Sequence, residues 1–405
     1  MANEKEETRL DRREFLKAAS LAGVGLTGYF AGSVSGCATT EVLKQEIASS
    51  LANIKPEPVV YPKLAGNKVQ PPENGCLVGF YKLHAKSMPD SYKKEWMSKT
   101  RDSENLNDIV RAFNKPKWDE VLSKTIGPHI NYYEQTLGRK AGIFVLIDTP
   151  RLFLNFPTLQ AAELKTQGII PYLNFVSLWP HKPALRMELD DIAKGKHNDK
   201  LTLLAQGAAN FGEKYGGYFV TTLHEMNGPF HYWGQSSKFK DGWKRIVDIF
   251  ENKGANKYAT WVWHTYAEGD ISKIAHDPDM YYPGDEYADW IGLTAYSRQM
   301  DSRTASMSFD SLVHKNYEVM HKSHPTKPIM MAEFGKTTGF GQARWLEKAY
   351  HSLKQMGGIK AAILYHHVSE GPLSTAVQGD DKNLTQDSLS ALREIVKDPY
   401  FIMAS

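Results

Sequence analysis

The sequence predicts a (β/α)8 barrel, in which eight parallel strands close into a cylinder surrounded by helices. Eight short apolar runs, rich in β-branched and aromatic residues, predict buried strands. Amphipathic segments with helical spacing separate most of these runs, which favours parallel strands joined by crossover helices. Because the number eight depends on where the boundaries are drawn, an open doubly wound sheet is the alternative.

The predicted elements alternate along residues 76–396. The strands are Cys76–Tyr81, Gly142–Ile147, Ile169–Ser177, Tyr218–Leu223, Ala259–His264, Trp290–Ala295, Pro328–Ala332 and Lys360–Tyr365. The clearest helices are Leu201–Tyr215, Asp241–Lys253, Phe309–His321, Gln342–Met356 and Gln386–Val396. Residues 88–137 are too long for one crossover connection, so we expect several helices and a loop there.

Length, charge and cysteine content narrow the classes of function. A chain of 405 residues can bury the core of one large barrel. The formal net charge is only +3, which provides no strong field toward nucleic acid. The only two cysteines are Cys37 and Cys76, so no cysteine-based metal site can be built. We therefore expect a monomer with no cofactor, no metal and no nucleic-acid partner.

Residues 1–36 are predicted to form an export signal. Arg12 and Arg13 precede an uncharged segment rich in Gly, Ala and Ser, a pattern that resembles a twin-arginine signal. The following Val34-Ser35-Gly36-Cys37 resembles a lipobox, whose diacylated cysteine anchors a protein stably in a membrane. We expect an exported bacterial lipoprotein, periplasmic or on the cell surface, that uses the twin-arginine machinery. An uncleaved membrane helix and a plain cleaved signal are the alternatives.

Residues 37–72 are predicted to be a tether between this anchor and the barrel domain at residues 73–405. A short helix is expected over Glu41–Ala52, and a proline-bearing stretch follows it. Such a segment can hold a domain away from a membrane surface. The alternative is an extended arm that packs on the domain.

Candidate catalytic groups gather where the predicted strands end, which is where barrels of this kind carry their active sites. Glu225 follows the fourth strand and Glu333 follows the seventh. Other polar or aromatic residues at strand ends are Asp148, Asn174, Ser177, Trp179, His224, Asn227, Trp261, Trp263, His264, Tyr266, Tyr296, Tyr365, His366 and His367. Glycoside hydrolysis needs two carboxyl groups, one to protonate the leaving oxygen and one to attack or to activate water. Flat aromatic rings near them would stack on sugar faces.

The sequence resembles glycoside hydrolase family 26 over residues 75–396. The resemblance rests on His224-Glu225-Met226-Asn227-Gly228, on Tyr296 and on Glu333. It implies a retaining endo-acting β-glycanase that acts on β-mannan or mixed-linked β-glucan, with Glu225 as acid/base and Glu333 as nucleophile. It also implies that Tyr296 hydrogen-bonds the nucleophile. The expected substrate-binding residues are His224, Tyr296, Trp263, Trp179, Phe230, Trp233, His264, Tyr365 and His366.

Three positions depart from the family pattern and bear on mannan specificity. Thr221 stands where an arginine is common, and Phe230 stands where a tryptophan is usual, with Trp233 nearby as a substitute. The end of the eighth strand reads Tyr365-His366-His367 instead of carrying a tryptophan. The alternative function is a diverged barrel that binds polysaccharide in glycan export or assembly. A zinc motif HExxH fails because Gly228 occupies the position of the second histidine.

Overall fold

The computed structural model describes residues 45, 47–49, 51–55, 59–81, 116–146, 156–175, 187–270, 272, 274–298, 307–337, 341–365 and 386–404. Several predictions fall outside these residues: the signal segment 1–36 and the positions Cys37, Asp148, Ser177, Trp179, His366 and His367.

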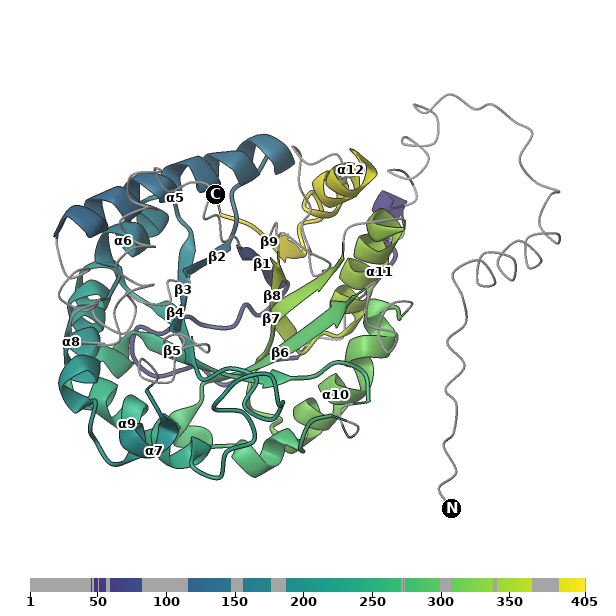
Figure 1. Ribbon diagram of the computed structural model, residues 1–405. Coiled ribbons are helices and arrows are strands. Elements are labelled where there is room, and N and C mark those ends of the chain that lie inside the picture. The colour runs from purple at the N-terminus through teal and green to yellow at the C-terminus, as the bar shows by residue number, and fades with distance from the viewer. Residues whose placement is uncertain are drawn as a thin grey trace, which may run out of the picture. The chain divides into compact units, whose positions relative to one another are not determined.

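Eight parallel strands close into a barrel (Figure 1), which confirms the predicted fold class. They are β1 (Cys76–Tyr81), β2 (Ile143–Leu146), β3 (Ile170–Phe175), β4 (Tyr218–Thr222), β5 (Ala259–Tyr266), β6 (Trp290–Ser297), β7 (Ile329–Lys336) and β8 (Ile359–Tyr365). Each strand pairs with the next, and β1 pairs with both β2 and β8, which closes the cylinder. A two-residue strand that was not predicted, β9 (Phe401–Ile402), pairs with the start of β1.

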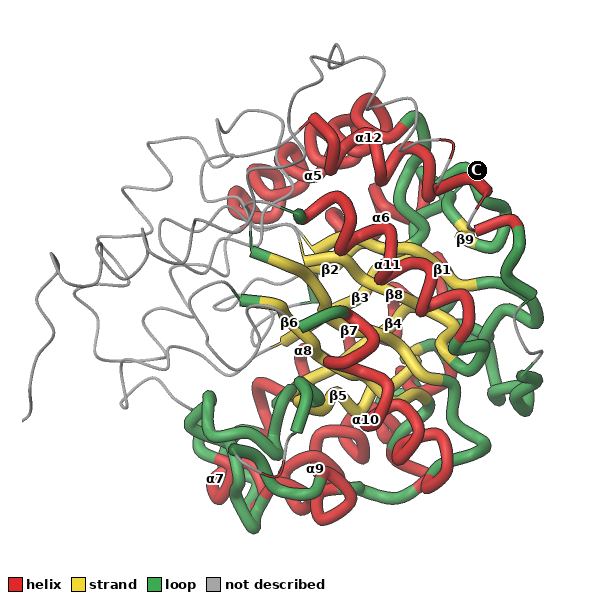
Figure 2. The backbone as a smooth tube through the Cα atoms, turned by 90° about the vertical axis from the view of Figure 1, so that its right-hand side faces the viewer, coloured by secondary structure: helices red, strands yellow, loops and turns green. Residues whose placement is uncertain are grey.

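Helices surround the strands on the outside (Figures 1 and 2). They are α5 (Pro116–Leu137), α6 (Thr158–Thr166), α7 (Leu189–Ala193), α8 (Asn198–Tyr215), α9 (Phe239–Asn252), α10 (Phe309–Ser323), α11 (Gln342–Gln355) and α12 (Gln386–Ile395). Short 3-10 turns η3 (Ala255–Lys257), η5 (Pro278–Tyr281) and η6 (Asp285–Tyr287) precede β5 and β6. The predicted boundaries of the later helices agree within about three residues, because apolar side chains at helical spacing define the face that packs on the barrel.

Side chains of the strands alternate between two apolar cores. One core fills the barrel and includes Tyr172, Phe219 and Val262. The other lies between strands and helices and includes Trp261 and Trp263, the neighbours of Val262 in β5. Successive side chains of a strand point to opposite faces, so odd and even residues of β5 belong to different cores.

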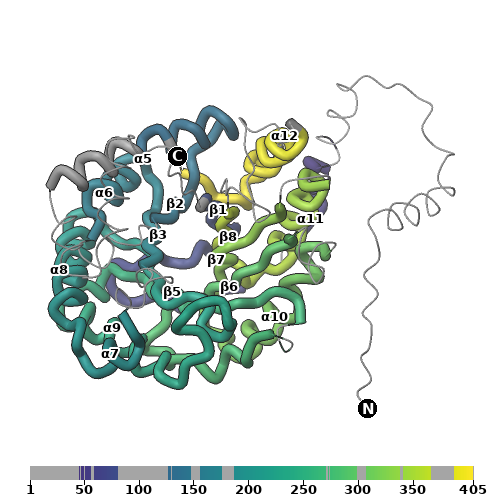
Figure 3. The backbone as a smooth tube through the Cα atoms, viewed as in Figure 1, coloured from purple at the N-terminus to yellow at the C-terminus, as the bar shows by residue number. Residues whose placement is uncertain are grey.

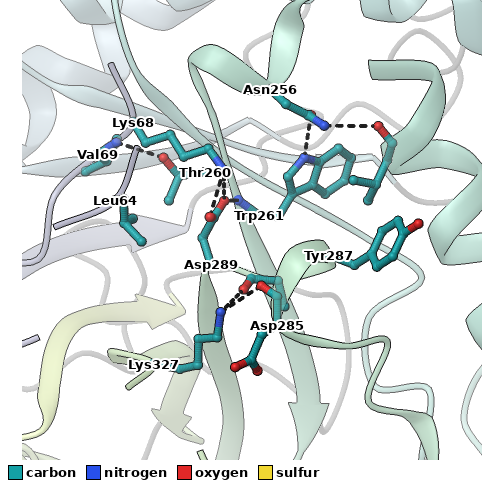
Figure 4. A network of polar contacts seen from close by, with 12 residues as sticks. Leu64, Lys68, Val69, Asn256, Thr260, Trp261, Asp285, Tyr287, Asp289 and Lys327 are labelled. Carbon is teal, nitrogen blue, oxygen red and sulfur yellow. Dashed lines mark hydrogen bonds and ion pairs between the residues drawn. The ribbon is translucent and has the colours of Figure 1, made fainter. Parts of the chain in front are cut away.

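Residues 59–72 form an arm that packs on the barrel (Figure 3). Lys68 Nζ lies 2.8 Å from a carboxylate oxygen of Asp289, and the Val69 N–H donates to Thr260 Oγ1 (Figure 4). Asn67 N–H donates to the carbonyl of Lys257. These partners lie at the amino-terminal ends of the strands. Residues 59–72 therefore form the packed arm that was the alternative to a free tether.

None of the helices in the described part of the chain has the length and apolar character needed to cross a membrane.

Candidate active site

Glu225 lies just beyond β4 on a backbone that is held in an unusual conformation. Leu223 and Glu225 have φ values of +48° and +54°, in the left-handed region that residues other than glycine rarely adopt. The Glu225 N–H donates to the carbonyl of His264 at 2.8 Å, which ties this turn to β5. Such strain persists where the surrounding structure fixes it, and it is common at functional sites. The Glu225 side chain is 12% exposed.

An irregularity in β7 determines the direction of the Glu333 side chain. Met330 and Ala332 belong to the core inside the barrel, whereas Met331 and Phe334 belong to the outer core. Simple alternation after Ala332 would turn Glu333 outward. The pairing with β6 shifts by one residue here: Leu293 lies opposite Met331, but Thr294 lies opposite Glu333. This β-bulge explains how Glu333 can face the mouth of the barrel instead of the helices.

Tyr296, near the end of β6, fixes the Glu333 carboxyl. Its hydroxyl donates to Glu333 Oε2 at 2.7 Å, as the resemblance implies. Tyr365, at the end of β8, packs edge-on against the Tyr296 ring with the centroids 5.5 Å apart. The ends of β6, β7 and β8 therefore contribute to one cluster.

Three histidines surround Glu225. His231 Nε2 lies 3.4 Å from Glu225 Oε2, and the His224 ring packs edge-on against the His231 ring. On its other side His224 stacks on His264, whose Nε2 lies 2.6 Å from Thr294 Oγ1. The donor atoms of His224, Glu225 and His231 lie within 4.8 Å of one another, so this group could hold a metal ion. Its third member is His231, which the sequence pattern did not reveal.

The two glutamates differ in their affinity for a proton. Burial and the charge of Glu225 raise the pKa of Glu333 to about 8, against the opposing hydrogen bond from Tyr296. Burial also raises the pKa of Glu225, but His231, whose Nε2 lies 3.4 Å from the carboxylate, and the charges of nearby histidines outweigh it and lower that pKa to about 2. In the free protein at neutral pH, Glu333 therefore holds a proton and Glu225 is charged.

Burial keeps two of the histidines neutral at that pH. It lowers the pKa of His264 to about 4 and that of His224 well below its usual range. Their charges therefore act on Glu225 only under acidic conditions. A neutral imidazole can either donate or accept a hydrogen bond at each ring nitrogen, depending on its tautomer.

Polar atoms face this site without protein partners. Among the described residues, Asn174 Oδ1, His224 Nδ1 and His264 Nδ1 are buried and have no hydrogen-bond partner. An unpaired buried polar group costs about 1–3 kcal/mol, so these atoms need water or the hydroxyl groups of a ligand. His224 and His264 lie close to Glu225, so their unpaired atoms are typical of a site that binds a polar molecule.

Sequence reasoning missed two further charged residues at the mouth. Glu268 lies two residues beyond β5 and Arg298 directly follows β6. Both Glu268 carboxylate oxygens accept from Arg298 Nη1, and the Glu268 side chain is fully buried. Their positions just after strand ends could have marked both residues as candidates for the site. The sequence could not show that Glu268 and Arg298 form an ion pair.

The structure places the predicted aromatic residues Phe230, Trp233 and Trp263 in three different surroundings. Phe230 is 51% exposed and its ring lies 4.9 Å from that of Tyr266, at the rim. Trp233 is buried; it stacks on His231, and its indole N–H donates to the His224 carbonyl at 2.8 Å. Trp233 therefore supports the histidines from behind, and the expectation that it contacts sugar is corrected.

Trp263 also needs correction as a predicted sugar contact. It is fully buried and packs against Tyr282 and His324 in the core between strands and helices. Its neighbour His264 points into the barrel instead, because adjacent strand residues face opposite sides. Asn227 is likewise structural, since its side chain bonds the backbone N–H and carbonyl of Tyr266.

Residues 187–363, which include both glutamates, match the model of Glycosyl hydrolase family 26. The predicted resemblance to this family is thereby confirmed, and the match supports glycoside hydrolase activity. Comparison with the sequences of curated proteins finds no significant match.

Solved structures of mannanases share the barrel. The Bacillus subtilis mannanase man26 is 15% identical, with a TM-score of 0.51 over 91% of this chain and 92% of that one. A β-mannanase from a symbiotic protist of the termite Reticulitermes speratus, complexed with gluco-manno-oligosaccharide, is 14% identical, with a TM-score of 0.52 over 87% and 97%. The GH26 domain of an endo-β-mannanase/endo-β-glucanase from Prevotella bryantii is 14% identical, with a TM-score of 0.51 over 82% and 91%. At these identities the likeness shows the fold.

Proposed function

We propose that this chain is a retaining endo-acting β-glycoside hydrolase that works by double displacement. Glu333 is the nucleophile and Glu225 the acid/base. The observation that carries the proposal is the Tyr296 hydroxyl on Glu333 Oε2, together with the raising of the Glu333 pKa by burial and by the charge of Glu225. A pair of carboxyl groups that influence each other in this way can share one proton, as the first step of the reaction requires.

The proton must lie on Glu225 when the glycosidic bond breaks. In the free site it lies on Glu333, so binding of the substrate must accompany its transfer to Glu225. Tyr296 and Arg298 favour this transfer, because the hydrogen bond and the positive charge both stabilise the Glu333 carboxylate. Glu333 then attacks the anomeric carbon while Glu225 protonates the leaving oxygen. In the second step Glu225 takes a proton from water, which releases the sugar from Glu333.

The substrate we propose is a β-mannan or a mixed-linked β-glucan. The polar atoms of Asn174, His224 and His264 can bind sugar hydroxyls, and the exposed Phe230 ring can stack on a sugar face at the rim. Mannanases and an endo-β-mannanase/endo-β-glucanase domain share the barrel. Thr221 and Tyr365 depart from the family pattern, so the relative rates on these two glycans must be measured.

The test is a screen of the purified domain on a panel of β-glycans, scored by new reducing ends. Glu333→Ala and Glu225→Ala should each abolish hydrolysis. Glu347→Gln is the matched control, because Glu347 is also a buried glutamate but pairs with Arg344 on α11. Proton NMR of the first product should show a retained anomeric configuration. A wild-type protein that binds a glycan and releases no reducing ends would instead favour the non-catalytic polysaccharide-binding barrel.

We also propose that the protein is exported by the twin-arginine machinery and anchored to a membrane through Cys37. The support is the Arg12-Arg13 pair and the lipobox-like Val34-Ser35-Gly36-Cys37. Metabolic labelling with radioactive palmitate should mark the protein, and Cys37→Ala should lose the label. Arg12→Lys combined with Arg13→Lys should retain the protein in the cytoplasm; export of that variant would contradict this route.

A further inference from the structure

The ends of β5 and β6 carry an ion pair that contacts Tyr296 on two sides. Arg298 lies over the Tyr296 ring, with its guanidinium carbon 4.6 Å from the ring centroid. Glu268 Oε1 accepts from the Tyr296 backbone N–H at 3.1 Å. Tyr296 is therefore held at its backbone and at its ring face by the two members of one ion pair.

The Glu268 carboxylate is fully engaged in this arrangement. Besides Arg298 and the Tyr296 N–H, it accepts from the Tyr266 hydroxyl at 3.0 Å. Its side chain has no exposed surface, and that of Arg298 is 23% exposed. A buried ion pair contributes little net stability, because desolvation offsets the attraction between the charges. Stability alone therefore does not account for a pair placed at the mouth of the barrel.

We propose that Glu268 and Arg298 are positioning residues for the nucleophile: they fix Tyr296 and, through its hydroxyl, the orientation of Glu333. This inference rests on the proposed function. The order of contacts is Glu268 to Arg298, Arg298 to the Tyr296 ring, and the Tyr296 hydroxyl to Glu333 Oε2. The first contact joins the ends of β5 and β6, the second lies at the end of β6, and the third joins β6 to β7.

The electrostatics of the cluster are consistent with this geometry. The positive charge of Arg298 lowers the pKa of Glu333, against the larger effects of burial and Glu225. Burial lowers the pKa of Arg298 itself, but the charge of Glu268 and its hydrogen bond, together with the charge of Glu225, raise it above its usual value. Arg298 therefore stays charged and supplies a fixed positive charge near both glutamates.

The experiment compares Arg298→Met with Arg298→Lys in the full mature chain. The methionine removes both the charge and the planar contact with Tyr296, whereas the lysine keeps the charge. For Arg298→Met we expect kcat to fall about tenfold to 100-fold, with KM changed less than threefold. The alkaline limb of its pH profile of kcat/KM, where the shared proton is lost, should move up by about 1 pH unit. Arg298→Lys should lower kcat while leaving that limb in place.

Lys68→Met provides the matched control. Lys68 also forms a partly buried ion pair with a carboxylate, Asp289, which likewise accepts from a backbone N–H, that of Trp261. This pair (Figure 4) lies at the amino-terminal end of the barrel, because Asp289 directly precedes β6. Lys68→Met should lower Tm without moving the pH profile. A purely structural role for Arg298 predicts the same behaviour for Arg298→Met, and that result would overturn the inference.

A second measurement does not depend on turnover. Carbon-13 NMR of protein labelled at the glutamate carboxyl carbon reports the titration of Glu333, which the spectrum of Glu333→Gln identifies. The pKa of Glu333 should be higher in Arg298→Met than in wild type. An unchanged titration contradicts the inference even if the wild-type protein cleaves no glycan, whereas absence of turnover in wild type contradicts only the proposed function.

Discussion

The Tyr296 hydroxyl donates a 2.7 Å hydrogen bond to Glu333 Oε2, and so joins the ends of β6 and β7 at the mouth of the barrel. Burial and the charge of Glu333 raise the pKa of Tyr296 well above its usual value, so Tyr296 remains a hydrogen-bond donor. The bond lowers the pKa of Glu333 against burial, which favours the carboxylate that a nucleophile requires.

Tyr296→Phe tests this bond directly. Loss of a hydrogen bond to a charged group costs about 1.5–3 kcal/mol, so kcat should fall roughly tenfold to 100-fold on a soluble β-glycan. The pKa of Glu333 should rise further, which moves the alkaline limb of the pH profile upward. Tyr218→Phe is the control, since it also removes a buried tyrosine hydroxyl, one that donates to the carbonyl of Ala208. An unchanged kcat for Tyr296→Phe would show that its hydroxyl plays no part in the reaction.

The stability of the wild type should depend on the proton of Glu333. Folding raises the pKa of Glu333 from 4.5 to about 8. The folded state thus binds a proton more tightly than the unfolded chain, and this stabilisation is complete below about pH 4.5 and lost as pH rises through about 8. Glu333→Gln removes the titration. Its Tm should equal that of wild type near pH 4.5 and exceed it by several degrees near pH 8.5. Parallel Tm curves would contradict the raised pKa.

Zinc should inhibit hydrolysis, because the proposed mechanism uses two carboxyl groups and zinc would bind one of them. Two imidazoles and a carboxylate form a donor set that suits Zn²⁺, and the donor atoms of His224, Glu225 and His231 lie within 4.8 Å of one another. Bound zinc would occupy the acid/base. Treatment with EDTA should leave the rate unchanged, and His231→Gln should weaken zinc inhibition relative to wild type. If EDTA abolishes activity and zinc restores it, the two-carboxylate mechanism is incorrect.

Substitution of Phe230 should affect substrate binding, whereas substitution of Trp263 should affect stability. Phe230→Ala removes an exposed ring at the rim, so KM for a polymeric glycan should rise about two- to tenfold, equivalent to about 0.5–1.5 kcal/mol, with Tm nearly unchanged. Trp263→Ala removes a fully buried ring, so it should lower the free energy of unfolding by about 3–5 kcal/mol. Urea denaturation and steady-state kinetics separate the two effects. A raised KM together with an unchanged Tm for Trp263→Ala would restore Trp263 to the site.

The packed arm should stabilise the barrel from its other end. A Cβ added at Gly217 would lie 2.4 Å from the carbonyl oxygen of Asn67, so Gly217→Ala should displace the arm. We expect a lower Tm and faster proteolysis near residues 59–72. The glycine Gly254 has open space around its Cβ position but a φ of +72°, so Gly254→Asn, which tolerates that φ, is a suitable control. Equal Tm values for both variants would show that the arm does not depend on this contact.

The sequence by itself determined the barrel and the strand ends that carry Glu225 and Glu333. Buried strands and amphipathic helices are local patterns, because each reflects the period with which side chains meet the core. The predicted strands agree with those observed to within a few residues, and the longer β5, β6 and β7 continue through the residues that approach the site. The sequence also placed Tyr296 beside Glu333 through the resemblance, and the hydrogen bond is present.

Only the tertiary structure decided which side chains meet. Alternation along β7 would have turned Glu333 toward the helices, and the bulge opposite Thr294 explains its inward direction. The same alternation, undisturbed in β5, carries Trp263 away from the site and His264 into it. The ion pair of Glu268 with Arg298 joins residues 30 positions apart on different strands. Such contacts depend on barrel closure and on single-residue shifts of register. Neither produces a periodic pattern in the sequence, so sequence patterns do not predict them.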